Sequence, residues 1–117
     1  MAAKTKRAHR IAELIQIVVA RLLQKKIFDP RLRLVAITGV DLSPDAKNAI
    51  VFFSLLDPSD ENINSAEKAF QEAVGFFRFQ LSRETKLRHT PKLNFKYDAS
   101  LMIGERVSNL LKVVNSK

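Results

Sequence analysis

The sequence predicts an α+β domain of two layers, in which helices cover one face of a three-stranded sheet. Apolar residues recur at helical spacing near the start, in the middle and near the end of the chain. Two β-rich segments flank a turn, and a third short segment alternates apolar with polar residues. Because a chain of 117 residues with 46% hydrophobic residues can bury one core, we expect a single domain over residues 1–117.

A first helix is predicted from about Arg7 to Lys26, after a basic N-terminal segment at residues 1–6. Its apolar stripe consists of Ile11, Ile15, Val18 and Leu22, at spacings of four, three and four. The helix should end at Asp29-Pro30, because a residue before proline is pushed out of the α region. Beside the stripe, the helical wheel places a basic edge formed by Arg7, Arg10, Arg21 and Lys25.

A hairpin is predicted next, from two segments rich in β-branched and aromatic residues at 34–42 and 48–56. Ser-Pro-Asp-Ala at 43–46 lies between them, with proline at the second turn position. Ser59 or Asp60 can then cap a second helix, whose positive N-terminal end favours the neighbouring acids. The acidic run at 57–61 is therefore better explained by helix capping than by metal binding.

The second helix is expected to reach a kink at Ala73 and Gly75, followed by a third helix that ends at Pro91. Glycine inside a helix costs about 1 kcal/mol relative to alanine, and the apolar stripe changes direction beyond Gly75, so we expect a bend or break there. On the third helix, Phe79 shares a side with Arg83 and Lys86. It is either a stacking platform for an unpaired base or part of the core.

Residues 92–98 alternate as a strand with one face in water, and a last helix is predicted at about 100–114. Its inner face carries Ile103, Val107, Leu110 and Val114. The predicted order is therefore helix, strand, strand, helix, kink, helix, strand and C-terminal helix.

The net charge of +8 is segregated along the chain. Residues 1–33 carry nine Lys/Arg against two acids, residues 34–72 two against seven, and residues 73–117 nine against three. Two basic segments that meet on one surface would attract a polyanion such as nucleic acid. There are no cysteines, which fits a reducing, cytoplasmic setting.

The sequence contains no convincing catalytic constellation. His9 and His89 lack a third local metal ligand, and the three glycines form no phosphate-binding loop or nucleophile elbow. We therefore expect a protein that is not an enzyme and has no cofactor or metal. The main alternative to RNA binding is a DNA-binding helix-turn-helix around Gly75, although Gln71 occupies the position where a small residue is usual.

Several short motifs together resemble the ribosome-binding factor A family, whose fold is that of a type II KH domain. They are Asp29-Pro30-Arg31, Ala73-Val74-Gly75 with Phe76 and Arg78, Lys86-Leu87-Arg88, Pro91-Lys92-Leu93-Asn94-Phe95 and Tyr97-Asp98. An ordinary KH domain grips a single strand with a G-x-x-G loop, whereas Gly39, Gly75 and Gly104 are far apart here. In the family, the Ala-x-Gly kink takes the place of that loop, so the resemblance implies recognition of phosphates and RNA shape.

The resemblance further implies a monomeric, cytoplasmic assembly factor that binds the free 30S subunit and assists late maturation of 16S rRNA, including its 5′ end, above all in the cold. Gly75 would set the angle of the third helix. The residues expected to contact RNA are Lys4, Lys6, Arg7, Arg10, Arg21, Lys25, Arg78, Phe79, Arg83, Lys86 and Arg88.

Overall fold

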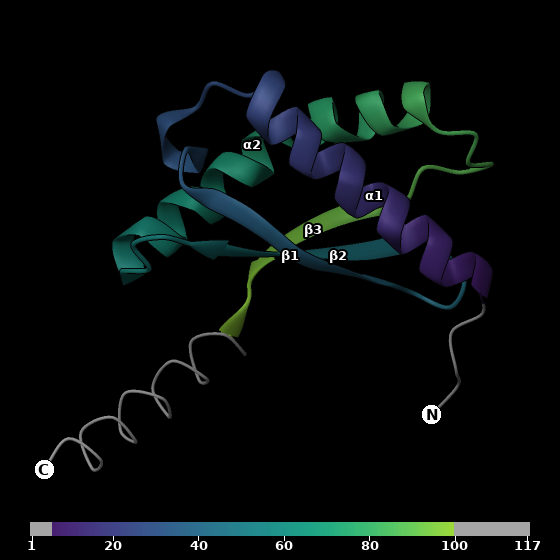
Figure 1. Cartoon of the computed structure of the whole chain (residues 1–117), viewed down its shortest axis with the longest axis horizontal. Helices are drawn as coiled ribbons and strands as arrows, with labels where there is room; N and C mark the ends of the chain where they lie inside the picture. The colour runs from purple at the N-terminus through teal and green to yellow at the C-terminus, as the bar shows by residue number, and fades with distance from the viewer. Residues whose placement is uncertain (1–5, 100–117) are drawn as a thin grey trace, which may run out of the picture.

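The computed structural model of the chain describes residues 6–99. It contains α1 (Lys6–Lys25), the short 3₁₀ helix η1 (Pro30–Leu32), β1 (Val35–Leu42), β2 (Asn48–Leu55), α2 (Asp60–Glu84) and β3 (Lys92–Tyr97). Both helices lie on the same side of the three-stranded sheet (Figure 1). The α+β fold of two layers is confirmed, while Lys4 and the helix predicted at 100–114 lie outside the described residues.

The helix α1 buries the predicted stripe, with Ile15, Val18 and Leu22 in the core. It ends at Lys25, before the predicted Asp29-Pro30 stop. Asp29 instead caps η1, because its carboxylate accepts a hydrogen bond of 2.9 Å from the backbone N–H of Arg31.

The predicted hairpin is confirmed. β1 and β2 pair antiparallel from Val35↔Leu55 to Leu42↔Ala49, and the turn is closed by a 2.9 Å hydrogen bond from the Ala46 N–H to the Ser43 carbonyl. β3 pairs with β2 in parallel, from Asn48↔Lys92 to Phe53↔Tyr97. Because parallel neighbours need a long crossover, α2 must cross the sheet before β3 can join it.

The predicted second and third helices are one α-helix of 25 residues, α2, so of the bend or break expected at Gly75 the break is absent. Figure 1 shows that its teal first half and green second half run in different directions, so the helix bends without breaking. A helical glycine costs only about 1 kcal/mol, which is less than the packing of Phe70 and Phe77, buried on either side of it. The helix-turn-helix alternative also fails, since no turn interrupts α2 at Gly75.

The end of α2 also differs from the prediction. The helix stops at Glu84, where Thr85 adopts an extended backbone with φ −121° and ψ 156°. The Thr85 hydroxyl donates a 2.6 Å hydrogen bond to the Leu81 carbonyl, as does the Thr85 N–H at 3.0 Å. Lys86 and Arg88, expected on a helix, therefore lie in the loop before β3.

A phenylalanine cluster forms the centre of the core between α2 and the sheet. Phe70 stacks on Phe95 with ring centroids 4.2 Å apart, and it contacts Phe53 at 5.0 Å and Phe77 at 6.0 Å. Within residues 6–99 the buried side chains are apolar, with no polar or charged residue among them. The fold is therefore held mainly by hydrophobic burial.

Replacing Gly75 by alanine is expected to stabilise the protein by about 0.5–1 kcal/mol, because alanine has the higher helix propensity. Gly75 has no positive φ, and an added Cβ would meet no atom within 4 Å. Thermal unfolding should show a melting temperature raised by a few degrees. A lowered melting temperature would show instead that the bend in α2 depends on glycine.

Candidate nucleic-acid interface

Three segments that are distant in sequence meet at one end of the molecule: the start of α1, the β1–β2 turn and the α2–β3 loop (Figure 1, right). Residues 6–10, 43–48 and 85–92 carry seven Lys/Arg against one acid, Asp45. We call these seven side chains the basic end: Lys6, Arg7, Arg10, Lys47, Lys86, Arg88 and Lys92. The convergence expected between the N-terminal and C-terminal basic segments is thus confirmed for part of each.

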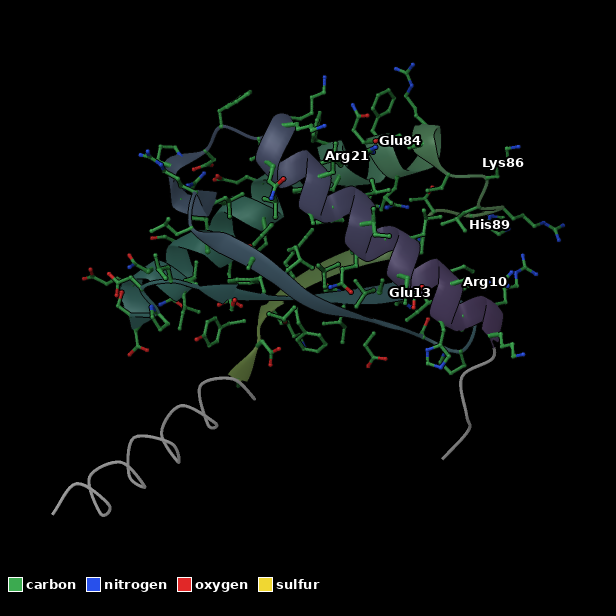
Figure 2. All side chains as sticks on the ribbon, in the orientation of Figure 1. Arg10, Glu13, Arg21, Glu84, Lys86 and His89 are labelled. Carbon is green, nitrogen blue, oxygen red and sulfur yellow. The ribbon has the colours of Figure 1, made fainter. Side chains whose placement is uncertain are left out.

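A cavity of ≈ 310 Å³ opens between these three segments. Its cationic residues are Arg7 from α1, Lys47 from the turn and Arg88 from the loop. Its apolar lining includes Ile11, Leu42, Leu87 and Pro91, and His89 also lines it. Figure 2 shows His89 with Arg10 and Lys86 at this same end. Three cations from three segments are therefore grouped around one hollow.

Arg78 holds the α2–β3 loop in place. Its Nε donates a 3.1 Å hydrogen bond to the Pro91 carbonyl, and its Nη2 donates one of 3.1 Å to the Thr90 carbonyl. A further hydrogen bond of 2.9 Å, from the Lys92 N–H to the Lys47 carbonyl, joins this loop to the β1–β2 turn. Arg78, predicted to contact RNA, thus positions the loop that carries Lys86 and Arg88.

The β1–β2 turn is fixed by Asp45. Its Oδ1 accepts hydrogen bonds from the Ser43 hydroxyl at 2.7 Å and from the Lys47 N–H at 3.0 Å. These bonds favour the ionised carboxylate, so the Ser43 hydroxyl first and the Lys47 N–H second lower the pKa of Asp45 below its usual 3.8. Ala46 follows with φ 59°, in the left-handed region. The turn thereby presents Lys47 at the rim of the cavity.

The stabilisation that Asp45 gives should disappear in acid. Because its pKa is lower in the folded than in the unfolded chain, the contribution is present above about pH 3.8 and is lost as the pH falls through the folded value. Urea unfolding should therefore show wild type more stable than Asp45→Asn at pH 7, with the difference shrinking below pH 3.8. A difference that stays constant with pH would contradict this assignment.

Four other predicted site residues lie on the helical layer, away from the cavity. Arg21 forms an ion pair with Glu84 that joins α1 to α2 (Figure 2), and Lys25 lines a hollow together with these two residues. Phe79 is 55% exposed, so it is not part of the core. The Arg83 guanidinium lies over its ring, 5.6 Å from the centroid.

Apart from Arg78 and Lys4, the predicted site residues therefore form two groups. Lys6, Arg7, Arg10, Lys86 and Arg88 belong to the basic end, whereas Arg21, Lys25, Phe79 and Arg83 lie along the helices. Lys47, His89 and Lys92 were missed as site residues. Lys47 directly follows the predicted turn at 43–46, and this position in the sequence could have indicated it. The position of Lys47 beside Lys92 depends on the parallel pairing of β3 with β2.

Within residues 6–99, no cluster of three or more His, Cys, Asp or Glu side chains is arranged to bind a metal ion. Neither described helix has the length and apolarity that crossing a membrane requires.

Known proteins are similar to this chain over nearly its whole length. The sequence model of the family "Ribosome-binding factor A" matches residues 7–111. Ribosome-binding factor A of Geobacter metallireducens is 40% identical over 112 residues, which cover 96% of this chain and 94% of the relative. That of Coxiella burnetii is 41% identical over 108 residues, covering 92% and 89% respectively.

Solved structures agree. The crystal structure of ribosome-binding factor A from Thermus thermophilus superimposes with a TM-score of 0.69 at 23% identity, covering 77% of this chain and 93% of that one. A homology model of the Thermus thermophilus protein, fitted into a cryo-EM map of its complex with 30S, gives 0.66 at 25% identity, covering 80% and 96%. Since both the sequence and the fold match over most of their length, this chain belongs to the ribosome-binding factor A family.

Proposed function

We propose that this protein binds the free 30S ribosomal subunit by contacting 16S rRNA with its basic end, and assists late maturation of that RNA, including its 5′ end, without catalysis. The observation that carries this proposal is the grouping of Arg7, Lys47 and Arg88 around one cavity. Three cations brought together from three segments form a preformed site for phosphates. The similarity to a protein fitted into a 30S map supports the choice of partner.

The helical residues Arg21, Lys25, Phe79 and Arg83 provide a second, weaker contact surface. Arg21 is already paired with Glu84, so binding a phosphate would cost part of that interaction. The exposed Phe79 ring can stack on an unpaired base. We propose that the basic end supplies most of the affinity, that the protein acts as a monomer in the cytoplasm, and that it matters most in the cold.

Sedimentation with purified 30S particles tests this proposal. If six or more phosphates are contacted, the affinity should fall by about 10³-fold to 10⁵-fold between 50 and 200 mM salt. Duplex DNA, tested at the same salt concentrations, serves as the control. The protein should bind it more weakly than 30S particles at each of them. Affinity for 30S that does not change with salt would contradict the proposal.

The absence of catalysis is tested separately. Purified protein incubated with precursor 16S rRNA, with and without Mg²⁺, should leave the RNA uncut and unmodified. Cleavage that persists after repurification of the protein would contradict this part of the proposal.

A further inference from the structure

The cavity of the basic end combines two kinds of surface that phosphate binding alone does not require. Arg7, Lys47 and Arg88 supply positive charge, which Asp45 in the same lining offsets in part, whereas Ile11, Leu42 and Leu87 supply apolar lining. Leu42 is buried at 2% exposure and forms part of the core, so the hollow reaches down to the core of the domain. Lys and Arg side chains alone suffice to neutralise phosphates, so the apolar lining indicates a ligand that is itself partly apolar.

An RNA nucleotide has this composition, because an apolar base with flat faces is attached to a charged phosphate. The volume of ≈ 310 Å³ is at the small end of ligand sites, which suits one nucleotide better than a longer segment. His89 also lines the cavity, and a histidine ring can stack on an unpaired base. The lining therefore offers a place for the base and the rim a place for its phosphates.

We propose that this cavity binds one unpaired nucleotide of an RNA, with its base against Ile11, Leu87 and His89 and its phosphates near Arg7 and Arg88. The inference rests on the proposed function and deepens it, because recognition by phosphates and RNA shape alone would leave the base unused. A base inside a duplex is stacked on both faces and cannot enter. The site accordingly selects single-stranded or bulged RNA over a continuous helix.

The base and phosphate contributions can be separated with probes of equal charge. Fluorescence anisotropy would compare octauridylate and octaadenylate with an eight-unit abasic phosphate oligomer. One stacked base contributes at least about 5-fold in affinity, so at least one of the two base-bearing octamers should bind wild-type protein about 5-fold more tightly than the abasic oligomer.

Two histidine variants form a matched pair for this measurement. His89→Ala should bring the ratio of the affinity for the base-bearing octamer to that for the abasic oligomer close to one. His9→Ala should leave this ratio unchanged, since His9 is exposed on α1 and does not line the cavity. NMR shifts of the Ile11 and Leu87 methyl groups should respond to adenosine or uridine 5′-monophosphate more than to ribose 5-phosphate.

Each outcome has a defined meaning. Equal affinity of wild type for abasic and base-bearing octamers overturns the nucleotide site and leaves the proposed function intact if 30S binding persists. Binding to 30S without measurable binding to any octamer overturns it as well. Absence of binding to 30S itself would remove the proposed function, on which the inference rests.

Discussion

Replacing Arg7 and Arg88 together by glutamate is expected to weaken binding to 30S particles by about 100-fold or more. The two exposed side chains come from α1 and the α2–β3 loop and flank the same cavity. Hydrogen bonds to charged groups contribute about 1.5–3 kcal/mol each, and each 1.4 kcal/mol is tenfold in affinity. The slope of log affinity against log salt should also decrease by about 2, because two phosphate contacts are lost.

The control for this charge reversal is Arg33→Glu combined with Lys68→Glu. Both residues lie outside the basic end, in the loop before β1 and in the first half of α2, and these two segments begin at the opposite end of the molecule (Figure 1). The net charge of the protein changes by the same amount in both variants. An equal loss of affinity in both would show that 30S senses only the total charge, and it would contradict a localised interface.

Phe70→Ala is expected to cost about 3–5 kcal/mol of unfolding free energy. Phe70 is fully buried and contacts the rings of Phe53, Phe77 and Phe95, so truncation leaves a cavity between α2 and the sheet. Because domains of this size are stable by only about 5–15 kcal/mol, the melting temperature should fall by more than about 10 °C. Urea unfolding followed by circular dichroism would measure the loss.

Phe79→Ala provides the matched control on the same helix. Phe79 is 55% exposed and its ring lies beneath the Arg83 guanidinium, an interaction that contributes about 0.5–1 kcal/mol at an exposed site. The variant should therefore unfold close to wild type. If Phe79→Ala destabilised the protein as strongly as Phe70→Ala, the assignment of Phe79 to the surface would be wrong.

Local sequence patterns predicted those parts of the fold that local chemistry determines. The apolar stripe of α1, the Ser43–Ala46 turn and the Ser59 cap each depend on residues close together in the chain, and all three are present. Of the bend or break predicted at Gly75, only the bend is present, because tertiary packing of α2 outweighs the low helix propensity of one glycine.

The site was less predictable than the fold. The basic end depends on which strand β3 joins, and the alternating pattern of residues 92–98 does not reveal its partner or direction. Lys86 and Arg88 were placed on a helix because Thr85 gives only a weak stop signal. The sequence predicts that Arg78 contacts RNA. Its hydrogen bonds to the Thr90 and Pro91 carbonyls exist only in the folded chain, so its role in positioning the loop could not be predicted.

The parallel pairing of β3 with β2 has a consequence for synthesis on the ribosome. A nascent chain that has emerged only as far as Glu84 contains α1, the hairpin and α2, but Lys86, Arg88 and Lys92 are still to come. The hydrogen bond from the Lys92 N–H to the Lys47 carbonyl, which joins the α2–β3 loop to the β1–β2 turn, also forms only after β3 has joined the sheet. The cavity with its three cations, Arg7, Lys47 and Arg88, is therefore assembled only after the chain has been made as far as Lys92 and β3 has joined the sheet.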